Sequence, residues 1–153
     1  MTADNIKVVG LSEFRQELKK LDDKGLTDEL KNVNFDIAQT VVSAAQAKAS
    51  GQGRMRQVAA DSLRPGRQAA RAVVTGGGAM LPFFGGAEFG AAQGVPRNTR
   101  RGTVAGWNQF EPWRGSSSAA GYFLYPAITE LTDEIVDKYG DAIEKIAAKA
   151  FPD

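Results

Sequence analysis

The stretch TDELKNVNFDIAQTVVSAAQAKAS, residues 27–50, decides much of the fold because it has the pattern of one long helix. Apolar residues recur along it at helical spacing, at Leu30, Val33, Ile37, Val41, Ala44 and Ala47. Thr27 is suited to cap the helix, and Asp28 and Glu29 favour its positive end. We interpret the segment as a core helix packed against a sheet. The alternative is a helix dedicated to oligomerisation.

A shorter amphipathic helix is predicted upstream from the apolar positions Leu11, Phe14, Leu18 and Leu21. Ser12 is placed to cap this helix, and Lys24 with Gly25 is placed to close it. The preceding residues 5–10, NIKVVG, predict a short strand that leads into a turn.

The C-terminal segment also predicts a helix. Pro126 suits its first turn, and Gly140 marks a point where the helix bends or splits. The apolar face consists of Ile128, Leu131, Ile135, Tyr139, Ala142, Ile146 and Ala150. The opposite face is acidic and carries Glu130, Asp133, Glu134, Asp137, Asp141 and Glu144. This face is either solvated or turned toward a basic partner.

Patterns between these helices are shorter. Residues 54–63, RMRQVAADSL, predict a short helix, and Pro65-Gly66 predicts a turn. Residues 67–78, RQAARAVVTGGG, predict a strand that ends in three glycines. We expect no regular element from Gly76 to Gly121. A stretch of this length usually carries function or becomes ordered on a partner.

Together these elements predict one α+β domain over residues 1–153. In it, a small antiparallel sheet packs against the long helix of the N-terminal half and against the C-terminal helix. An extended loop at about residues 91–120 becomes ordered on assembly. A chain of 153 residues is long enough for one packed core and too short to expect two.

Composition excludes several function classes. The chain has no cysteine and no histidine, which removes disulfides, thiolate or imidazole metal sites, and Ser-His-Asp or Cys-His catalysis. Carboxylates alone show no diagnostic spacing, so we expect a protein that is not an enzyme and has no metal or cofactor. No apolar run approaches the roughly 18 to 20 residues of a membrane span. The N-terminus lacks the regions of a signal peptide, so we expect folding in a cytoplasm and no membrane partner.

Charge is divided along the chain. The net charge is −1 for residues 1–50, +6 for 51–120 and −4 for 121–153, and every basic residue of the middle segment is arginine. Arginine pairs bidentately with carboxylates and phosphates and stacks on aromatic rings, which favours a role in interfaces. The alternative is that these arginines are solvated or pair with the acidic ends of the same chain.

The stretch LPFFGGAEFG, residues 81–90, places one carboxylate among aromatic residues. We expect Phe83, Phe84 and Phe89 to anchor a glycine-rich loop to the core. A carboxylate in such surroundings needs hydrogen bonds or a charged partner. We therefore predict that Glu88 accepts an arginine, either Arg71 or Arg114 of the same chain or an arginine of a neighbouring subunit.

The loop that follows combines flexible backbone, aromatic anchors and arginines, which is the composition of interface hot spots. We predict that this loop becomes ordered against adjacent subunits. Together with Glu88, its candidate interface residues are Arg97, Arg100, Arg101, Trp107, Phe110, Trp113 and Arg114.

The order of these parts resembles the tail-component proteins of tailed bacteriophages that are typified by gene product ten of phage Hong Kong ninety-seven. The resemblance rests on VVGLSEFRQELKKL, the alanine-rich helix, SLRPGRQAARAVV, PFFGGAEFG and GYFLYPAI, and it covers nearly the whole chain. QFEPWRG followed by GYFLYPAI is similar to the actinobacteriophage branch. The structural motif residues on these segments are Phe83, Phe84, Phe89, Gly90, Tyr122, Tyr125 and Pro126.

The resemblance implies a structural virion protein of the phage neck or upper tail, assembled in the bacterial host cytoplasm. Such proteins are α+β domains that form rings around the DNA channel, and they act in tail completion and in joining tail to head. Six copies are expected, with twelve as the alternative. The implied partners are neighbouring neck and tail proteins such as head-closure and tail-terminator proteins. Channel DNA would be contacted only through its phosphates and without sequence specificity.

A nucleic-acid-binding module is the alternative function. The middle segment, with its net charge of +6 and interleaved aromatic residues, favours it. The acidic C-terminal helix and the absence of common nucleic-acid motifs disfavour it.

Overall fold

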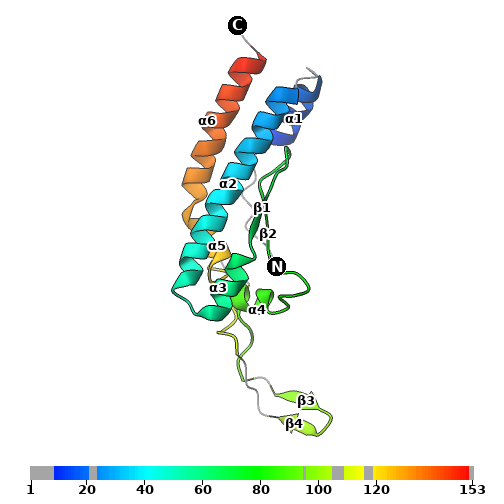
Figure 1. Cartoon of the computed structure of the whole chain (residues 1–153), viewed down its shortest axis with the longest axis vertical. Helices are drawn as coiled ribbons and strands as arrows, with labels where there is room; N and C mark the ends of the chain where they lie inside the picture. The colour runs from blue at the N-terminus through cyan, green and yellow to red at the C-terminus, as the bar shows by residue number, and fades with distance from the viewer. Residues whose placement is uncertain (1–8, 21–23, 95, 105–108, 116–118, 152–153) are drawn as a thin grey trace.

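The structure is a computed structural model and describes residues 9–20, 24–94, 96–104, 109–115 and 119–151. Within these ranges the chain forms six helices and two separate antiparallel hairpins (Figure 1). The predicted α+β class is confirmed, although the expected sheet consists of two hairpins that do not pair with each other. The strand predicted over residues 5–10 lies almost wholly outside the described residues.

The first two helices begin earlier than predicted. α1 spans Leu11–Lys20 and α2 spans Lys24–Ser50. The carbonyl of Gly10 accepts the N–H of Phe14 at 2.9 Å, so the first turn of α1 already includes Ser12. The caps predicted at Ser12 and Thr27 are therefore wrong. Leu26 is buried, and this burial draws the chain into α2 before Thr27.

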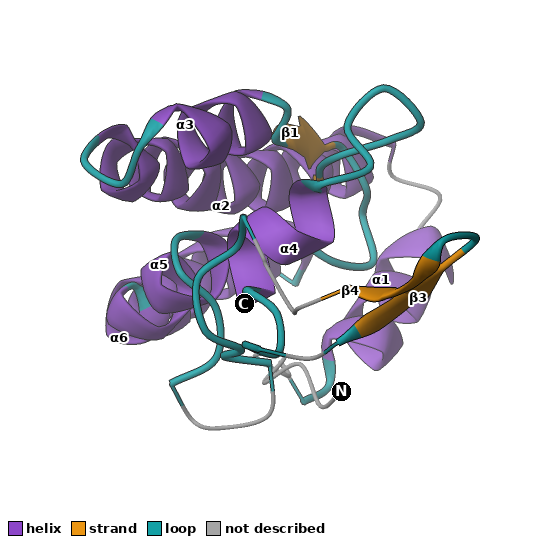
Figure 2. Cartoon of the chain, turned by 90° about the horizontal axis from the view of Figure 1, so that it is seen from below, coloured by secondary structure: helices purple, strands orange, loops and turns teal. Residues whose placement is uncertain are grey.

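α2 is the central helix. It packs against α3, Arg54–Asp61, on one side and against α5, Leu124–Glu130, and α6, Thr132–Ala150, on the other (Figure 2). The short helix predicted over residues 54–63 is thus confirmed as α3. Because α2 has neighbours on two sides, its buried stripe is wider than a single helical face.

The predicted apolar face of α2 is confirmed in its first half only. Leu30, Ile37 and Val41 are buried. In the second half Ala47 is exposed, and Ala45 and Ala49 are buried instead. The buried face shifts around the helix in this half, because α3 packs against the C-terminal end of α2. The helix is a core element, as interpreted, and it packs mainly against other helices.

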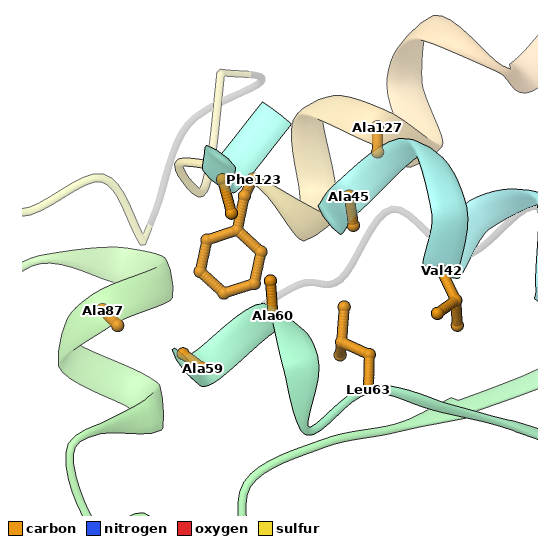
Figure 3. Close-up of a cluster of buried hydrophobic side chains, with 9 residues drawn as sticks. Val42, Ala45, Ala59, Ala60, Leu63, Ala87, Phe123 and Ala127 are labelled. Atoms are coloured by element: carbon orange, nitrogen blue, oxygen red, sulfur yellow. The ribbon is translucent and has the colours of Figure 1, made fainter. Parts of the chain in front are cut away.

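Two apolar clusters form the core. The first joins α1, α2 and α6 and includes Leu11, Leu26, Leu30, Ile37, Val41, Ile135, Tyr139 and Ile146. The second surrounds the ring of Phe123, which is fully buried (Figure 3). Its other buried members are Val42, Ala45, Ala49, Ala59, Ala60, Leu63, Ala87 and Ala127. Small alanine side chains on α2, α3, α4 and α5 let these helices approach one aromatic ring closely.

The first hairpin pairs β1, Arg64–Gly66, with β2, Val73–Thr75. The turn predicted at Pro65-Gly66 is wrong because these residues lie in β1. A hairpin of two strands leaves one edge of each strand unpaired, and such an edge tolerates proline. The strand predicted over residues 67–78 shortens to β2.

A buried polar network holds the loop of this hairpin to the helices. Asn34 of α2 donates from Nδ2 to the carbonyls of Gln68 and Ala69 at 2.8 and 3.0 Å. Its Oδ1 accepts the hydroxyl of Tyr139 of α6 at 2.6 Å. Asn34 is fully buried. The network therefore satisfies a polar side chain that would otherwise cost free energy in the core.

The segment from Gly76 to Gly121 contains regular elements, contrary to expectation. α4 spans Phe84–Phe89, and a second hairpin pairs β3, Arg97–Thr99, with β4, Gly102–Val104. α4 packs against α3. The second hairpin lies well away from the helices, at one end of the molecule (Figure 1).

The C-terminal helical segment divides at Leu131, which separates α5 from α6. Of the two outcomes predicted at Gly140, a bend or a split, the split is wrong, because α6 continues through Gly140. Pro126 occupies the first turn of α5, as predicted. The acidic face is confirmed as exposed.

Candidate functional site: the hairpin arm and its base

The arm comprises residues 91–115, of which 95 and 105–108 are not described. Where it leaves the body, its two ends are joined by backbone hydrogen bonds. The N–H of Ala91 donates to Glu111 O at 2.9 Å, and the N–H of Arg114 donates to Phe89 O at 2.6 Å. Gly90 allows this approach, because its φ is +72° and a Cβ there would lie 2.3 Å from the carbonyl oxygen of Pro112.

The Glu88 carboxylate is the centre of the arm base, which we define as residues 88–91, 111–114 and 121–125. Glu88 lies in α4 and its side chain is fully buried. Oε2 accepts the N–H groups of Phe123 and Leu124 at 3.2 and 2.9 Å. Oε1 accepts the N–H of Tyr125 at 2.9 Å. The first N–H groups of a helix lack partners within it, so Glu88 caps α5 from a distant part of the chain.

The predicted pairing of Glu88 with Arg71 or Arg114 is wrong. Three backbone amides occupy both carboxylate oxygens. Arg71 is exposed in the loop before β2, and Arg114 contacts an aromatic ring. Because Glu88 does not reach the surface of the chain, pairing with an arginine of a neighbouring subunit is also inconsistent with this structure.

The environment of Glu88 shifts its titration. Burial raises the pKa of Glu88 above its ordinary value of 4.5. The three backbone N–H groups and the positive charge of Arg56 favour the carboxylate and oppose this rise. A carboxylate that is closed from solvent and fully hydrogen-bonded has no open side for a substrate. Its role is to hold α4 against α5.

Gly121 makes room for the carboxylate. Its φ is +79°, and a Cβ at this position would lie 2.1 Å from Oε1 of Glu88. An alanine here would meet both a strained backbone and a steric clash. The N–H of Gly121 also donates to Arg114 O at 2.7 Å, which joins the chain before α5 to the returning end of the arm.

Tyr122 is contacted by two arginines from different segments. The guanidinium carbons of Arg56 and Arg114 lie 3.9 and 4.2 Å from the centre of its ring. Arg56 also donates from Nε to Ala87 O at 3.1 Å, and the Tyr122 hydroxyl donates to Pro112 O at 2.7 Å. Cation–π contacts of this kind contribute about 0.5 to 2 kcal/mol each, depending on exposure. They connect α3, α4 and the arm through one ring.

Aromatic side chains complete the base. Phe89 lies between Trp113 and Tyr125, with ring centres 6.1 and 5.2 Å away. Phe110 lies over Gly86, where a Cβ would be 2.4 Å from its ring. Trp113 remains 53% exposed despite its contact with Phe89. The base therefore presents part of an indole ring to the surroundings.

The anchoring to the core that was predicted for the phenylalanines is confirmed for Phe83 and Phe84. Phe84 makes an edge contact with Phe123, with ring centres 6.0 Å apart. Phe83 and Phe84 both pack against the second apolar cluster. Phe89 anchors the base through its two aromatic neighbours.

The arm tip, residues 97–104, is a tight hairpin. Asn98 pairs with Thr103, and the Thr103 hydroxyl donates to Asn98 Oδ1 at 2.8 Å. The Thr99 hydroxyl donates to Gly102 O at 2.7 Å across the turn. Arg100 and Arg101 occupy the turn and are exposed. Residues 91–110 contain three arginines and no acidic residue, so the tip is basic.

The structure thus divides the predicted interface residues into two groups. Phe110, Trp113 and Arg114 belong to intramolecular contacts at or near the base. Arg97, Arg100 and Arg101 belong to the tip, where Arg97 forms part of β3. Trp107 lies outside the described residues.

Two residues that form contacts at the base were not predicted, Arg56 and Gly121. Arg56 lies in α3, more than thirty positions before Glu88, and nothing in the sequence connects it with Tyr122. Gly121 directly precedes the aromatic start of a helix, and a glycine at such a boundary indicates a positive φ. That signal was available in GYFLYPAI, but it does not identify Glu88 as the neighbour.

The described part of the chain holds no group of three or more acidic side chains arranged to bind a metal ion. None of its helices is long and apolar enough to cross a membrane. Comparisons with protein-family models, with curated proteins and with solved structures find no match to this chain. Its own geometry is therefore the basis for a functional proposal.

Replacing Glu88 with alanine tests the cap directly. Glu88→Ala leaves three N–H groups at the start of α5 without an acceptor, so we expect the free energy of unfolding to fall by roughly 3 kcal/mol. Urea denaturation followed by circular dichroism measures this change. Glu111→Ala is the matched control, because Glu111 is an exposed acid at the same base. Equal stability of the two variants would contradict the role of Glu88.

The raised pKa of Glu88 also predicts a pH dependence. Between the ordinary value of 4.5 and the higher pKa of the folded state, the folded protein binds more protons than the unfolded chain. The contribution of Glu88 to stability therefore decreases as pH rises through this window. Over the same window, we expect the stability of the wild type to decrease relative to that of Glu88→Gln as pH rises. Urea denaturation at a series of pH values measures it, and the opposite slope would contradict the raised pKa.

Gly121 offers a second test of the packing around Glu88. Gly121→Ala is expected to destabilise the fold through backbone strain and through the clash with Oε1. Gly94→Ala is a matched control, because Gly94 has a φ of +67° and open space where the Cβ would lie. Thermal unfolding should show a larger loss for Gly121→Ala. If both variants lose the same stability, the clash with the carboxylate has no role.

Proposed function

We propose that the chain is a structural subunit of a phage neck or upper tail, which forms a ring around the DNA channel and acts in tail completion and head-tail joining. The observation that carries this proposal is the arm. Its base is fixed to the body by Glu88, Gly121 and Tyr122. Its tip extends away from every helix (Figure 1).

An arm of this construction suits contact with another molecule. β3 and β4 pack principally with each other and form no substantial contact with the helices. An isolated two-stranded hairpin is only marginally stable in water. A partner at the tip would supply the apolar and polar contacts that the chain itself does not give. Binding through a fixed base then positions that partner relative to the body.

The resemblance to phage tail-component proteins supports the same proposal. Two of the segments that carry it, PFFGGAEFG and GYFLYPAI, are far apart in sequence. They meet at the arm base, where Glu88 of the first accepts the N–H groups of Phe123, Leu124 and Tyr125 of the second. The two sequence motifs that carry the resemblance therefore also hold the arm to the body.

The arm base and the arm tip have different proposed roles. Phe110, Trp113 and Arg114 hold the base together, while Arg100 and Arg101 present charge at the tip. We propose that the tip becomes ordered against an adjacent subunit in a ring of six copies, or of twelve. Head-closure and tail-terminator proteins are the proposed neighbours above and below. The assembled protein would belong to the virion.

The arm tip also favours a second function, a nucleic-acid-binding module. Its three arginines have no acidic neighbour between residues 91 and 110, and Arg100 and Arg101 are exposed. Such a tip attracts phosphates, and the attraction weakens as salt increases. In a ring around DNA, the same contact would be compatible with the first function.

The two functions are separated by adding the purified chain to tails that lack it. We expect light scattering to show that the chain joins such tails, and we expect the tails to regain attachment to heads. A variant in which a Gly-Gly turn replaces residues 97–104 should fold and fail to join. Met80→Ser is the control, because Met80 is exposed on a different loop. A chain that ignores tails and binds short duplex DNA in a salt-dependent manner would overturn the neck proposal.

A further inference from the structure

The solvent-exposed side of α6 is a second surface of interest, separate from the arm. We call it the α6 stripe, and it consists of Asp133, Val136, Asp137, Gly140, Asp141 and Glu144, all of them exposed. Their spacing of three and four residues places them on one side of the helix. Among the described residues, the four acids of the stripe form no ion pair, whereas the adjacent Glu130 and Glu134 pair with Lys48 and Lys138.

The middle of the stripe has features that solvation alone does not explain. Val136 is 54% exposed between carboxylates. Gly140 lies inside a helix, where glycine is less favourable than alanine. Apart from its two chain neighbours and the nearby backbone of α6 itself, no described atom lies within 4 Å of the position that a Cβ would take at Gly140. The chain itself therefore has no packing reason for glycine there, and the bare backbone leaves space for another chain to approach closely.

The arm tip matches this stripe in charge and size. The tip carries arginines without acids, and the stripe carries acids without a basic residue. From Asp133 to Glu144 the stripe extends over about 16 Å, at roughly 1.5 Å per residue. Three-residue strands such as β3 and β4 are about 10 Å long. One tip therefore covers most of one stripe.

We propose that the arm tip of one copy binds the α6 stripe of another copy of this chain. In this contact Arg100 and Arg101 pair with Asp137 and Asp141, and the turn lies over Val136 and Gly140. The tip and the body that carries α6 lie toward opposite ends of one molecule, so a tip does not reach the stripe of its own chain (Figure 1). A second copy is the partner because the same chain carries both surfaces of complementary charge. This inference rests on the proposed function and deepens it.

Such a contact has a consequence for assembly. The tip and the stripe are different surfaces, so each copy binds one neighbour with its tip and another with its stripe. A contact of this heterologous type closes into a ring when the rotation between copies permits. Surface charges supply much of the attraction, so assembly should weaken as salt increases.

Cysteine cross-linking tests the contact directly, because the chain has no native cysteine. Full-length Arg100→Cys and Asp137→Cys are purified separately, mixed and oxidised. We expect a disulfide-linked heterodimer that decreases at high salt. Asp36→Cys replaces Asp137→Cys in the control mixture, because Asp36 is an exposed acid on α2 outside the stripe. Equal cross-linking in the two mixtures, or none in either, overturns the inference.

Charge reversal adds a test that does not require oxidation. The tip variant carries Arg100→Glu and Arg101→Glu, and the stripe variant carries Asp137→Lys and Asp141→Lys. We expect each variant alone to associate at least about tenfold more weakly than the wild type, measured by sedimentation velocity. A one-to-one mixture should recover association, because reversed tips then meet reversed stripes and natural tips meet natural stripes. Failure of the mixture to recover would contradict the pairing.

The outcomes also separate this inference from the proposed function. If the wild type joins tails and both reversed variants join equally well, the tip-to-stripe contact is wrong and the neck function stands. If no protein joins tails while the specific cross-link forms, the contact stands and the neck function fails. If the tip variant loses only salt-dependent binding to duplex DNA, the arginines bind phosphate and the inference is overturned.

Discussion

The structure depends most on one buried carboxylate that accepts three backbone N–H groups. Glu88 lies in the last turn of α4, a short helix whose other contacts are with small residues and aromatic rings. By capping α5, it fixes the point where the arm leaves the body and the point where the chain enters its last two helices. Burying a carboxylate is unfavourable unless its hydrogen bonds are satisfied. This requirement explains why Gly121 must lack a side chain, because a Cβ there would displace the carboxylate from its hydrogen bonds. The rings of Phe89 and Tyr125 pack together beside the same site.

The fold combines a rigid body with an extended tip. In the body, alanines on α2 and α3 allow close packing around Phe123, and the Asn34 network fixes the first hairpin to two helices. The same close approach occurs at the base, where Gly90 contacts the backbone of Pro112. Beyond the base, close packing ends. Hydrogen bonds at the base hold the two ends of the arm together, and Arg100 and Arg101 at the tip are exposed and available to a partner.

Periodicity predicted the helices well, because apolar spacing reports directly on burial. It placed α1, α2 and the C-terminal helical segment within a few residues. Capping was predicted poorly at Thr27, because burial of Leu26 outweighs a favourable side chain at the helix start. The alternative of a split at Gly140 was wrong, because an exposed glycine in an otherwise well-packed helix reduces helix stability without ending the helix.

The candidate site was predicted in part. The sequence showed that Glu88 needed a partner and that the phenylalanines anchor the loop. It did not show that these partners are backbone amides. Every residue type except proline has a backbone N–H group, so no sequence pattern identifies the ones that Glu88 binds. The sequence also could not predict which residues belong to the base and which to the tip. That division depends on contacts between distant segments, such as the contact of Arg56 with Tyr122.

The most direct measurement of the central claim is residue-resolved amide hydrogen exchange of the free, full-length chain. The account predicts slow exchange for the amides of Phe123, Leu124 and Tyr125, because they donate hydrogen bonds to Glu88. It predicts fast exchange for the amides of the tip, residues 97–104. Slow exchange at both places would mean that the tip is stabilised within the chain and needs no partner. Exchange at Phe123, Leu124 and Tyr125 as fast as at the tip would show that Glu88 does not hold the base, and would contradict the account.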